Sequence, residues 1–451
     1  MMGERVVMQE SLFYQFRLED HVPADHLLRH IDRFVDLTDL RTYLSPFYSA
    51  IGRPSIDPEL MIRMLIVGYC YGIRSERRLC EEVHLNLAYR WFCRLGLDGR
   101  VPDHSTFSKN RHGRFAESAV FRHVLETVVA RCMAEGLVDG EGFAVDASLI
   151  EADANRQRGV PGSEWSAPEM ASRSVREYLA VLDETVWGRA TDVVPKFVSP
   201  ADPAAQWTGA MRGPAFFAYA DNYLIDVKAA VIVDVEASRA VRQAEVGAAK
   251  RMIERTAERF GLKPQRLAGD TAYGSAEMLN WLVEAKQIAP HIPVIDKSSR
   301  QDGTFAREDF RYDEATDTYT CPDGKPLTTT GTLVNEGATL LYRASTADCG
   351  RCQLKPRCCP NTPTRKVPRS LYERARDLTR SLAGTPAFER SRRERKRVEM
   401  LFAHLKRILR LGRLRLRGPC GARDEFLLAA TAQNLRKLAK LIPVPQPILA
   451  T

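Results

Sequence analysis

A predicted helix near the C-terminus, over residues 389–411, carries side chains suited to chemistry on a phosphate. At about 3.6 residues per turn, Arg395, Glu399 and Lys406 fall on one narrow face of this helix. A carboxylate among so many cations is either a metal ligand beside a polyanion or half of an Arg–Glu ion pair at i, i+4 spacing, worth about 0.2–0.5 kcal/mol. The helix alone favours the ion pair, and the rest of the chain reverses that preference.

Two aspartates stand where the sequence predicts the ends of strands. Asp146 closes the apolar run 142–147, and Asp270 follows a predicted strand over 266–269 in the word GDTAYGS. A side chain at the carboxyl end of a strand projects beyond the sheet, so we expect both carboxylates to meet there and Glu399 to join them. Taken singly, each aspartate is also compatible with a turn cap.

Three carboxylates brought together repel one another unless cations lie between them. Hard oxygen ligands favour Mg²⁺ or Mn²⁺. Two such ions about 3.5–4 Å apart can clamp the attacking and leaving oxygens of a phosphodiester. The three side chains therefore predict a two-ion site for phosphodiester chemistry.

Positive charge is concentrated around the same helix. Residues 390–417 contain twelve Lys or Arg against Glu394 and Glu399, a net charge of +10, whereas the whole chain carries +9. Such a focused patch indicates a polyanionic partner, most plausibly DNA or RNA. A solvated basic helix is the alternative.

Five of the ten cysteines lie close together in the sequence. Cys321, Cys349, Cys352 and Cys358 follow the pattern C-x27-C-x2-C-x5-C, and Cys359 adjoins the last of them. The C-x2-C step lets two thiolates reach one tetrahedral zinc ion, so we predict a candidate structural zinc site. The sequence leaves open whether Cys358 or Cys359 is the fourth ligand, and unligated thiols are the alternative.

Length and composition bound the class of protein. The 451 residues suffice for two to four domains, and an apolar content of 44% is ordinary for a globular protein. The longest apolar run, 60–73, contains Arg63 and is too short to span a bilayer, and the N-terminus has no secretory h-region. We therefore expect a cytoplasmic protein without a membrane partner.

Predicted elements divide the chain into four parts. Residues 1–136 read as helices, with caps at Asp57, Ser75 and Asp103. One helix is expected over 75–96, and short helices with tight turns there resemble a helix-turn-helix arrangement; plain helical packing is equally compatible.

Strands and helices then alternate over 137–296, with turns expected at 220–222 and 228–230 and with Gly261 ending a helix. Residues 297–385 form a β-rich insertion that contains the cysteines, and 386–445 hold the basic helix and a closing helix. We expect a multidomain α+β or α/β protein in which a mixed sheet is covered by helices.

Longer words resemble a known family. Six segments of the chain resemble bacterial insertion-sequence transposases of the DDE type, close to the IS1182 group. Five of them are GRPSIDPELMIRMLIVGYCYGIRSERRLCEEVHLNLAYRWFCRLGL, DHSTFSKNR, VDAS, NYLIDVKAAVIVDVEAS and GDTAYGS. The sixth is the pattern R-x3-E-x6-K at Arg395, Glu399 and Lys406. The related pattern has Tyr where Arg392 stands.

This resemblance implies several expectations. The core is expected to be RNase H-like, as in retroviral integrases, with Asp146, Asp270 and Glu399 binding two Mg²⁺ or Mn²⁺ ions. The N-terminal helices are expected to recognise terminal inverted repeats in double-stranded DNA, and a homodimer is expected in the DNA complex. The resemblance implies DNA contacts at Arg395 and Lys406. Arg392 on the basic helix, and Lys109 and Arg111 in the N-terminal helices, are further expected DNA contacts from the reading of the residues themselves.

Two other classes of function remain open. One is a non-catalytic or domesticated DNA-binding protein, although all three carboxylates are intact. The other is a metal-dependent nuclease that hydrolyses DNA without joining the freed 3′ ends to a target. A transposase would both cut the DNA and join the freed 3′ ends to a target. It would act at the nucleoid of a bacterial cell.

Overall fold

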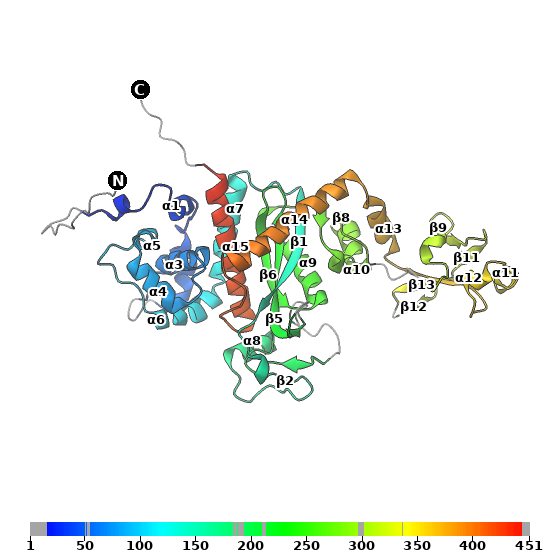
Figure 1. The fold of residues 1–451 in the computed structure, drawn as a ribbon, viewed down its shortest axis with the longest axis horizontal. Helices are drawn as coiled ribbons and strands as arrows, with labels where there is room; N and C mark the ends of the chain where they lie inside the picture. Colours follow the sequence, from blue (N-terminus) through cyan, green and yellow to red (C-terminus); the bar gives the residue numbers. More distant parts are fainter. Residues whose placement is uncertain are drawn as a thin grey trace, which may run out of the picture.

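The computed structural model describes residues 16–443 apart from 50, 52–54, 183, 185–186, 188–193, 210–212, 296–301 and 336. The ends of the first and last predicted parts, residues 1–15 and 444–445, therefore lie outside the described residues. Along its longest axis the molecule places N-terminal helices at one end, a sheet in the middle and the cysteine-containing insertion at the other end (Figure 1).

Helices form the regular structure of the described chain as far as Ala134. Their bounds are η1 Leu18–His21, α1 Leu27–Asp32, α2 Leu40–Leu44, η2 Ser45–Phe47, α3 Pro58–Cys70, α4 Glu76–Leu85, α5 Leu87–Phe92, α6 His104–Asn110, η3 Arg111–Phe115 and α7 Val120–Ala134. The predicted caps are present: the side chains of Asp57, Ser75 and Asp103 accept backbone N–H groups at the starts of α3, α4 and α6.

The prediction of one helix over 75–96 is wrong. Asn86 adopts an extended backbone (φ −98°, ψ 119°), and its side chain accepts the N–H groups of Ala88 and Tyr89. Asn86 thereby ends α4 and caps α5, because an Asn side chain competes well for backbone donors.

A mixed sheet forms the middle of the molecule. Its strands are β1 Gly142–Glu151, β4 Gln206–Thr208, β5 Phe216–Asp226, β6 Val231–Arg239, β7 Arg266–Ala268 and β8 Ala289–His291. β1 pairs with β7 and β7 with β8 in parallel, while β5 pairs antiparallel with β1, β4 and β6. The order from β6 to β8 is thus β6-β5-β1-β7-β8, with β4 beside the start of β5.

Two predictions about these strands are wrong. Asp146 lies in the middle of β1 rather than at its end, because β5 is long enough to pair with β1 as far as Glu151. Residues 220–222 are not a turn but lie within β5. The expected turn at 228–230 does separate β5 from β6, and Ala230 there has φ 55°.

Long helices cover the sheet. α9 Arg242–Phe260 packs against β5 and β6, and the predicted stop at Gly261 is confirmed by its left-handed backbone (φ 67°). α14 Pro386–Arg407 packs against β1, β7 and β8, and α15 Gly418–Leu441 packs against α7, α3 and β6. The remaining elements near the sheet are η5 Thr271–Tyr273, α10 Ala276–Asn280 and η6 Trp281–Ala285.

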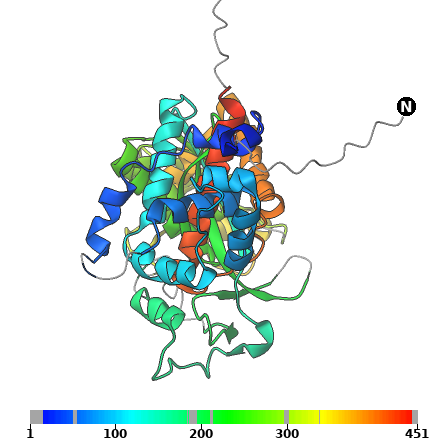
Figure 2. The same cartoon turned by 90° about the vertical axis from the view of Figure 1, so that its left-hand side faces the viewer.

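One apolar core joins the N-terminal helices to the sheet. Buried side chains of α3, α7, β5 and α15 belong to a single cluster. Seen from the end, the N-terminal helices lie in front of α15 and the sheet (Figure 2). The excursion after β1 contains η4 Arg156–Arg158, β2 Val160–Pro161, α8 Arg173–Ala180 and β3 Phe197–Val198.

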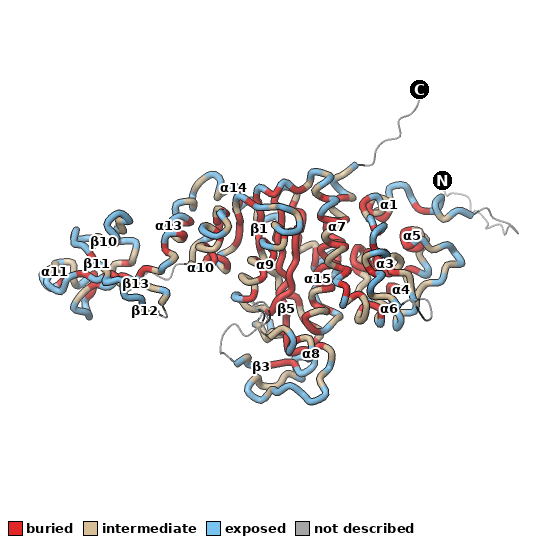
Figure 3. The backbone as a smooth tube through the Cα atoms, turned by 180° about the vertical axis from the view of Figure 1, so that it is seen from behind, coloured by how far each residue is buried: buried red, intermediate tan, exposed pale blue. Residues whose placement is uncertain are grey.

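The insertion has a small core of its own. Its elements are η7 Arg307–Asp309, β9 Arg311–Asp313, β10 Thr318–Thr320, β11 Pro326–Thr328, β12 Leu333–Val334, β13 Thr339–Ala344, α11 Thr346–Arg351, α12 Lys355–Cys358, β14 Lys366–Ser370 and the returning helix α13 Glu373–Leu382. Tyr319, Leu327 and Tyr342 are buried there in a cluster separate from the main core. Exposed and partly buried residues predominate in the insertion, whereas buried residues predominate in the central strands (Figure 3).

A group of buried ion pairs lies at the neck of the insertion, which is the place where the chain leaves the sheet near Ile295 and returns through α13. The carboxylate of Glu373, 1% exposed, pairs with Arg307, Arg376 and Arg380. Arg376 also donates to the carbonyl of Ile295 at 2.7 Å, and α13 packs against α10 and β8. The chain therefore leaves the sheet and returns to it at neighbouring points.

No helix among the described residues combines the length and the apolar character needed to cross a membrane.

Candidate active site

Asp146 lies on β1, and Asp270 lies two residues beyond the end of β7, the parallel neighbour of β1. Ala144 of β1 is paired with Ala268 of β7, and each aspartate follows two residues later. Neighbouring strands are about 4.8 Å apart, so the fold brings together two carboxylates that are far apart in the sequence. β7 ends at Ala268, so Asp270 lies just beyond the carboxyl end of this strand, as the sequence predicted. The neighbouring part of β1 is its middle, where Asp146 lies.

Local hydrogen bonds fix both aspartates. Asp270 caps η5 by accepting the N–H of Ala272 at 2.8 Å, and Asp146 accepts the N–H of Ala147 at 2.9 Å. Gly269 precedes Asp270 in a crowded place, where a Cβ atom would lie 3.3 Å from the side chains of Val145 and Tyr273. Each carboxylate thus keeps one oxygen occupied by backbone and has the other available.

Glu399 reaches the same region from α14. This helix begins at a Thr385 cap and buries Val398, Leu401 and Phe402 against the sheet. The ring of Phe402 stacks on that of Tyr223 (4.8 Å between centroids), and Tyr223 is the β5 partner of Asp146. Glu399 lies three residues before Phe402, and its side chain is 63% exposed.

The other two carboxylates affect the pKa of Asp146. Burial raises the pKa of Asp146 to about 6, the N–H of Ala147 and Arg395 oppose the rise, and Asp270 and Glu399 add to it. Each of these charges lies close enough to influence Asp146, which fits a donor set that a divalent cation would stabilise. Among the described residues, however, the side chains as placed form no group of three or more His, Cys, Asp or Glu able to hold a metal ion.

A fourth carboxylate belongs to this region and was missed from the sequence. Burial raises the pKa of Glu245, and Asp270 and Asp146 raise it further. Glu245 lies in the first turn of α9, which packs against η5. Its sequence context is an ordinary amphipathic helix start, so only the three-dimensional fold reveals its neighbours.

The ion pair that competes with metal binding is also present. The side chains of the partly exposed Arg395 and the exposed Glu399 approach to 3.9 Å, a separation at which a solvent-accessible ion pair contributes little. Lys406 follows on the same helix, where partial burial lowers its pKa and the buried Asp221 opposes that change. Arg392 is exposed and pairs with Glu389 at 3.4 Å.

The two predicted contacts from the N-terminal helices differ in exposure. Lys109 is exposed on α6. The Arg111 guanidinium is buried, pairs with Glu76 at 2.8 Å and lies over the ring of Phe121. The Arg111 side chain thus joins η3 to α4 instead of facing solvent.

The cysteines of the insertion surround one small pocket. Cys321, Cys349, Cys352, Cys358 and Cys359 all line it, and none of the ten cysteines forms a disulfide. The Cys321 sulfur accepts the N–H of Lys325 at 3.3 Å. Burial and the neighbouring Cys359 together raise the pKa of Cys358 to about 11, so this thiol needs a cation to ionise near neutral pH.

Comparison with known families gives two matches. A model described as a transposase domain (DUF772) matches residues 16–113, and one described as a transposase DDE domain matches residues 320–439. The second match includes Arg395, Glu399 and Lys406, while both aspartates lie outside it. DDE transposase domains generally use divalent metal ions.

One solved structure is similar at a low level. It is the cryo-EM structure of a piggyBac transposase synaptic complex with hairpin DNA, at 9% sequence identity and a TM-score of 0.31, with 94% of this chain and 81% of that chain covered. Similarity at this level supports no inference about residues. The matches at both ends of the chain carry the assignment: this protein is a DDE transposase of the insertion-sequence type.

Proposed function

We propose that Asp146, Asp270 and Glu399 are the catalytic carboxylates of this transposase and that they bind two Mg²⁺ or Mn²⁺ ions. The observation that carries the proposal is the parallel register of β1 and β7, which sets the two aspartates side by side. The influence of Asp270 and Glu399 on the pKa of Asp146 supports it. The strand order β6-β5-β1-β7-β8, with β5 antiparallel to β1, further supports an RNase H-like core.

Each residue has a distinct part in the proposed reaction. When bound, the ions would activate an attacking water or 3′-hydroxyl and stabilise the leaving oxygen. Asp146 and Asp270 hold one side of the site on a rigid sheet, and Glu399 supplies the other side from α14. Arg395 keeps its guanidinium beside Glu399 and presents it to the phosphate, where preorganised charge stabilises the transition state.

The proposed DNA substrate is double-stranded, comprising the element's inverted repeats and a target, and is bound by a homodimer at the nucleoid in the cytoplasm. The proposed phosphate contacts are the exposed Arg392, Lys406 and Lys109 and the partly exposed Arg395. We leave Arg111 out of this set because its guanidinium is committed to Glu76.

A structural zinc ion in the insertion is a separate proposal. Cys321, Cys349 and Cys352 would supply three thiolates, and Cys358 or Cys359 the fourth. All five line the same pocket, and an N–H donated to a cysteine sulfur, as from Lys325, suits a thiolate. Among the described residues the cysteine side chains do not yet form a group able to hold a metal ion. Zinc binding would therefore bring their sulfur atoms closer together.

The test uses a supercoiled plasmid that carries this gene with its flanking DNA. Purified protein with Mg²⁺ or Mn²⁺ should cut at paired inverted repeats, and Asp146→Asn should not cut while still binding the DNA. Asp139→Asn, which changes an exposed aspartate just before β1, is the matched control and should cut normally. Normal cutting by Asp146→Asn would refute the site.

The same reaction separates the alternatives. Joining of the freed 3′ ends to a second plasmid indicates strand transfer, whereas cutting without joining indicates a nuclease. Binding without cutting in either metal would indicate a non-catalytic DNA-binding protein.

A further inference from the structure

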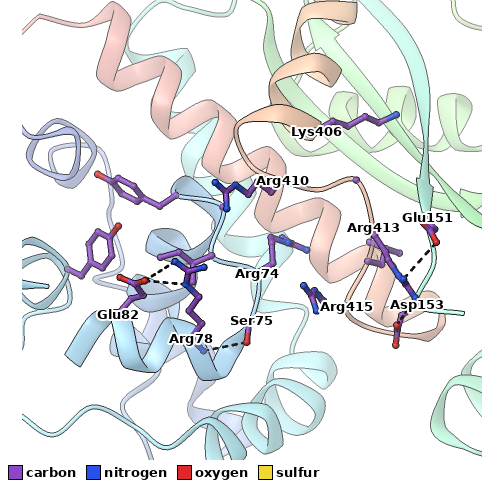
Figure 4. A pocket seen from close by; sticks show the side chains of 16 residues that line it. Arg74, Ser75, Arg78, Glu82, Glu151, Asp153, Lys406, Arg410, Arg413 and Arg415 are labelled. Carbon is purple, nitrogen blue, oxygen red and sulfur yellow. Dashed lines mark hydrogen bonds and ion pairs between the residues drawn. The ribbon is translucent and has the colours of Figure 1, made fainter. Parts of the chain in front are cut away.

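A large basic pocket lies between the N-terminal helices and the sheet. One wall is the turn 71–75 between α3 and α4 together with the start of α4, and the other is the end of α14 and the segment that follows it, as far as residue 415. Glu151 and Asp153 also line the pocket. The pocket encloses about 1030 Å³ and six of its lining residues are cations (Figure 4). They are Arg74, Arg78, Lys406, Arg410, Arg413 and Arg415.

Three of these cations have carboxylate partners. Arg78 pairs with Glu82 at 3.1 Å, Arg413 pairs with Asp153 at 3.3 Å, and Arg74 pairs with the buried Glu425. Within the described part of the chain, Lys406, Arg410 and Arg415 have no carboxylate within ion-pair distance, and all three are exposed. The pocket therefore presents uncompensated positive charge, as a site for an anionic ligand would.

The walls are held in place by a buried carboxylate. Glu425, 1% exposed, accepts the N–H groups of Arg415 and Leu416 at 2.6 Å each and also pairs with Arg74, whose guanidinium lies 4.3 Å from the ring of Tyr69. One side chain of α15 thereby fixes both the turn after α3 and the segment that carries the free cations.

The two walls also touch directly. Gly72 has φ 67°, and a Cβ atom there would lie 3.0 Å from the carbonyl of Ile408 and 3.1 Å from the side chain of Arg410. Arg436 of α15 donates to the carbonyl of Cys70 at 2.9 Å. Contacts within the fold thus hold the backbone of both walls in place.

The pocket continues from the proposed catalytic site. Glu151 is five residues beyond Asp146 in β1, which at about 3.3–3.4 Å per residue is roughly 17 Å. Lys406 is seven residues beyond Glu399 in α14, or about 10 Å at 1.5 Å per residue. A strand positioned at the carboxylates can reach the pocket within a few nucleotides.

We propose that the basic pocket binds the sugar-phosphate backbone of the DNA strand that leads away from the catalytic carboxylates, through Arg410 and Arg415. This inference rests on the proposed function for the identity of the polymer. It makes the junction between the N-terminal helices and the core a DNA-binding surface, so that both parts hold the same DNA molecule.

The test measures the salt dependence of DNA binding by fluorescence anisotropy, with a labelled random-sequence duplex of about 40 base pairs at about 50 to 300 mM salt. Loss of two phosphate contacts should reduce the slope of log Kd against log salt by about 1.8. We therefore expect Arg410→Ala with Arg415→Ala to flatten the slope by that amount. The double Lys variant keeps both charges and should retain the wild-type slope.

A matched control removes two cations elsewhere. Arg259 and Lys263, exposed near the end of α9, should be changed together to Ala, with no change in slope. An unchanged slope in the Arg410 and Arg415 double variant, or an equal loss in the control, would overturn the proposal. If the Ala pair does not fold, as judged by circular dichroism, the Gln pair tests the same charges.

The plasmid assay keeps this inference distinct from the catalytic proposal. A flattened slope together with normal cutting by Asp146→Asn would refute the carboxylate site and support the pocket. Abolished cutting by Asp146→Asn, together with an unchanged salt slope in the Arg410 and Arg415 double variant, would support the carboxylate site and refute the pocket.

Discussion

The carboxylate site and the cysteine pocket gather candidate metal ligands in opposite ways. Asp146 lies on β1, Asp270 follows β7 and Glu399 lies on α14, and successive residues of the three are more than a hundred positions apart. Only the complete main core brings these elements into one region. The five cysteines lie between 321 and 359 in an insertion with its own apolar cluster. Long-range folding therefore builds the first site and local chain geometry the second.

This difference in how the ligands are brought together predicts a different role for each metal ion. In the core, apolar packing fixes the ligands before a cation arrives, so metal binding should affect reaction more than folding. In the insertion, few apolar side chains are buried, so a zinc ion would supply much of the stability. The predictions that follow test this contrast.

The largest expected effect comes from Glu399→Gln. If Glu399 is a metal ligand, DNA cutting should fall at least about a thousandfold, or about 4 kcal/mol of transition-state stabilisation. Glu389→Gln is the matched control, since Glu389 is on the same helix and also pairs with an arginine. A loss below about tenfold would favour the Arg395–Glu399 ion pair as the residue's main role.

Cys352→Ser should remove the zinc of the insertion and leave the core folded. Metal analysis should give about one zinc per wild-type chain and almost none for the variant. Hydrogen exchange should then show lost protection in β9 to β14 and unchanged protection in β1 and β5. Cys420→Ser, outside the insertion, should keep its zinc, and wild-type protein purified without zinc would contradict the proposal.

Glu245→Gln should have an intermediate effect on the core site. Removing this carboxylate lowers the negative charge around Asp270 and Asp146, so more Mg²⁺ should be needed for half-maximal cutting, by about 10- to 100-fold if Glu245 supports the metal ligands. Glu258→Gln, an exposed residue later in α9, serves as the control. Unaltered Mg²⁺ dependence would show that Glu245 has no part in binding.

The smallest functional effect is expected at a buried carboxylate that belongs to neither site. Burial raises the pKa of Asp424 in α15 from 3.8 to about 7. The folded state then holds a proton that the unfolded state releases, so stability is highest below about pH 4 and falls as pH rises towards 7. Asp424→Asn should raise the free energy of unfolding by roughly 2–4 kcal/mol at pH 8 and by little at pH 4.

Denaturant unfolding of both proteins at the two pH values measures this difference. DNA cutting by Asp424→Asn should stay near the wild-type rate, which would separate a carboxylate that costs stability from carboxylates that bind metal. An equal stability gain at both pH values would argue against proton binding by Asp424.

Sequence patterns predicted the local features well and the long-range features poorly. The caps at Asp57 and Asp103 and the helix stop at Gly261 follow from neighbouring residues, and all are confirmed. The length of β1 depends on β5, about 70 residues later, and was underestimated. Glu245 carries no local mark of its neighbours, and so it could not be identified in advance.

The basic pocket shows the same limit. The excess of positive charge over 390–417 was plain in the sequence. Which arginines pair with carboxylates and which remain uncompensated depends on Glu425 and the turn after α3, which only the tertiary structure brings together.

The ion-pair group at the neck has a consequence for how the gene can change. Because Glu373 and its arginines join the two ends of the insertion beside β8, additions or deletions beyond the neck need not shift α14 along the sheet. The position of Glu399 is thereby insulated from length variation in the module that precedes it. We therefore expect changes of length within the insertion to leave the place of Glu399 on α14 unchanged.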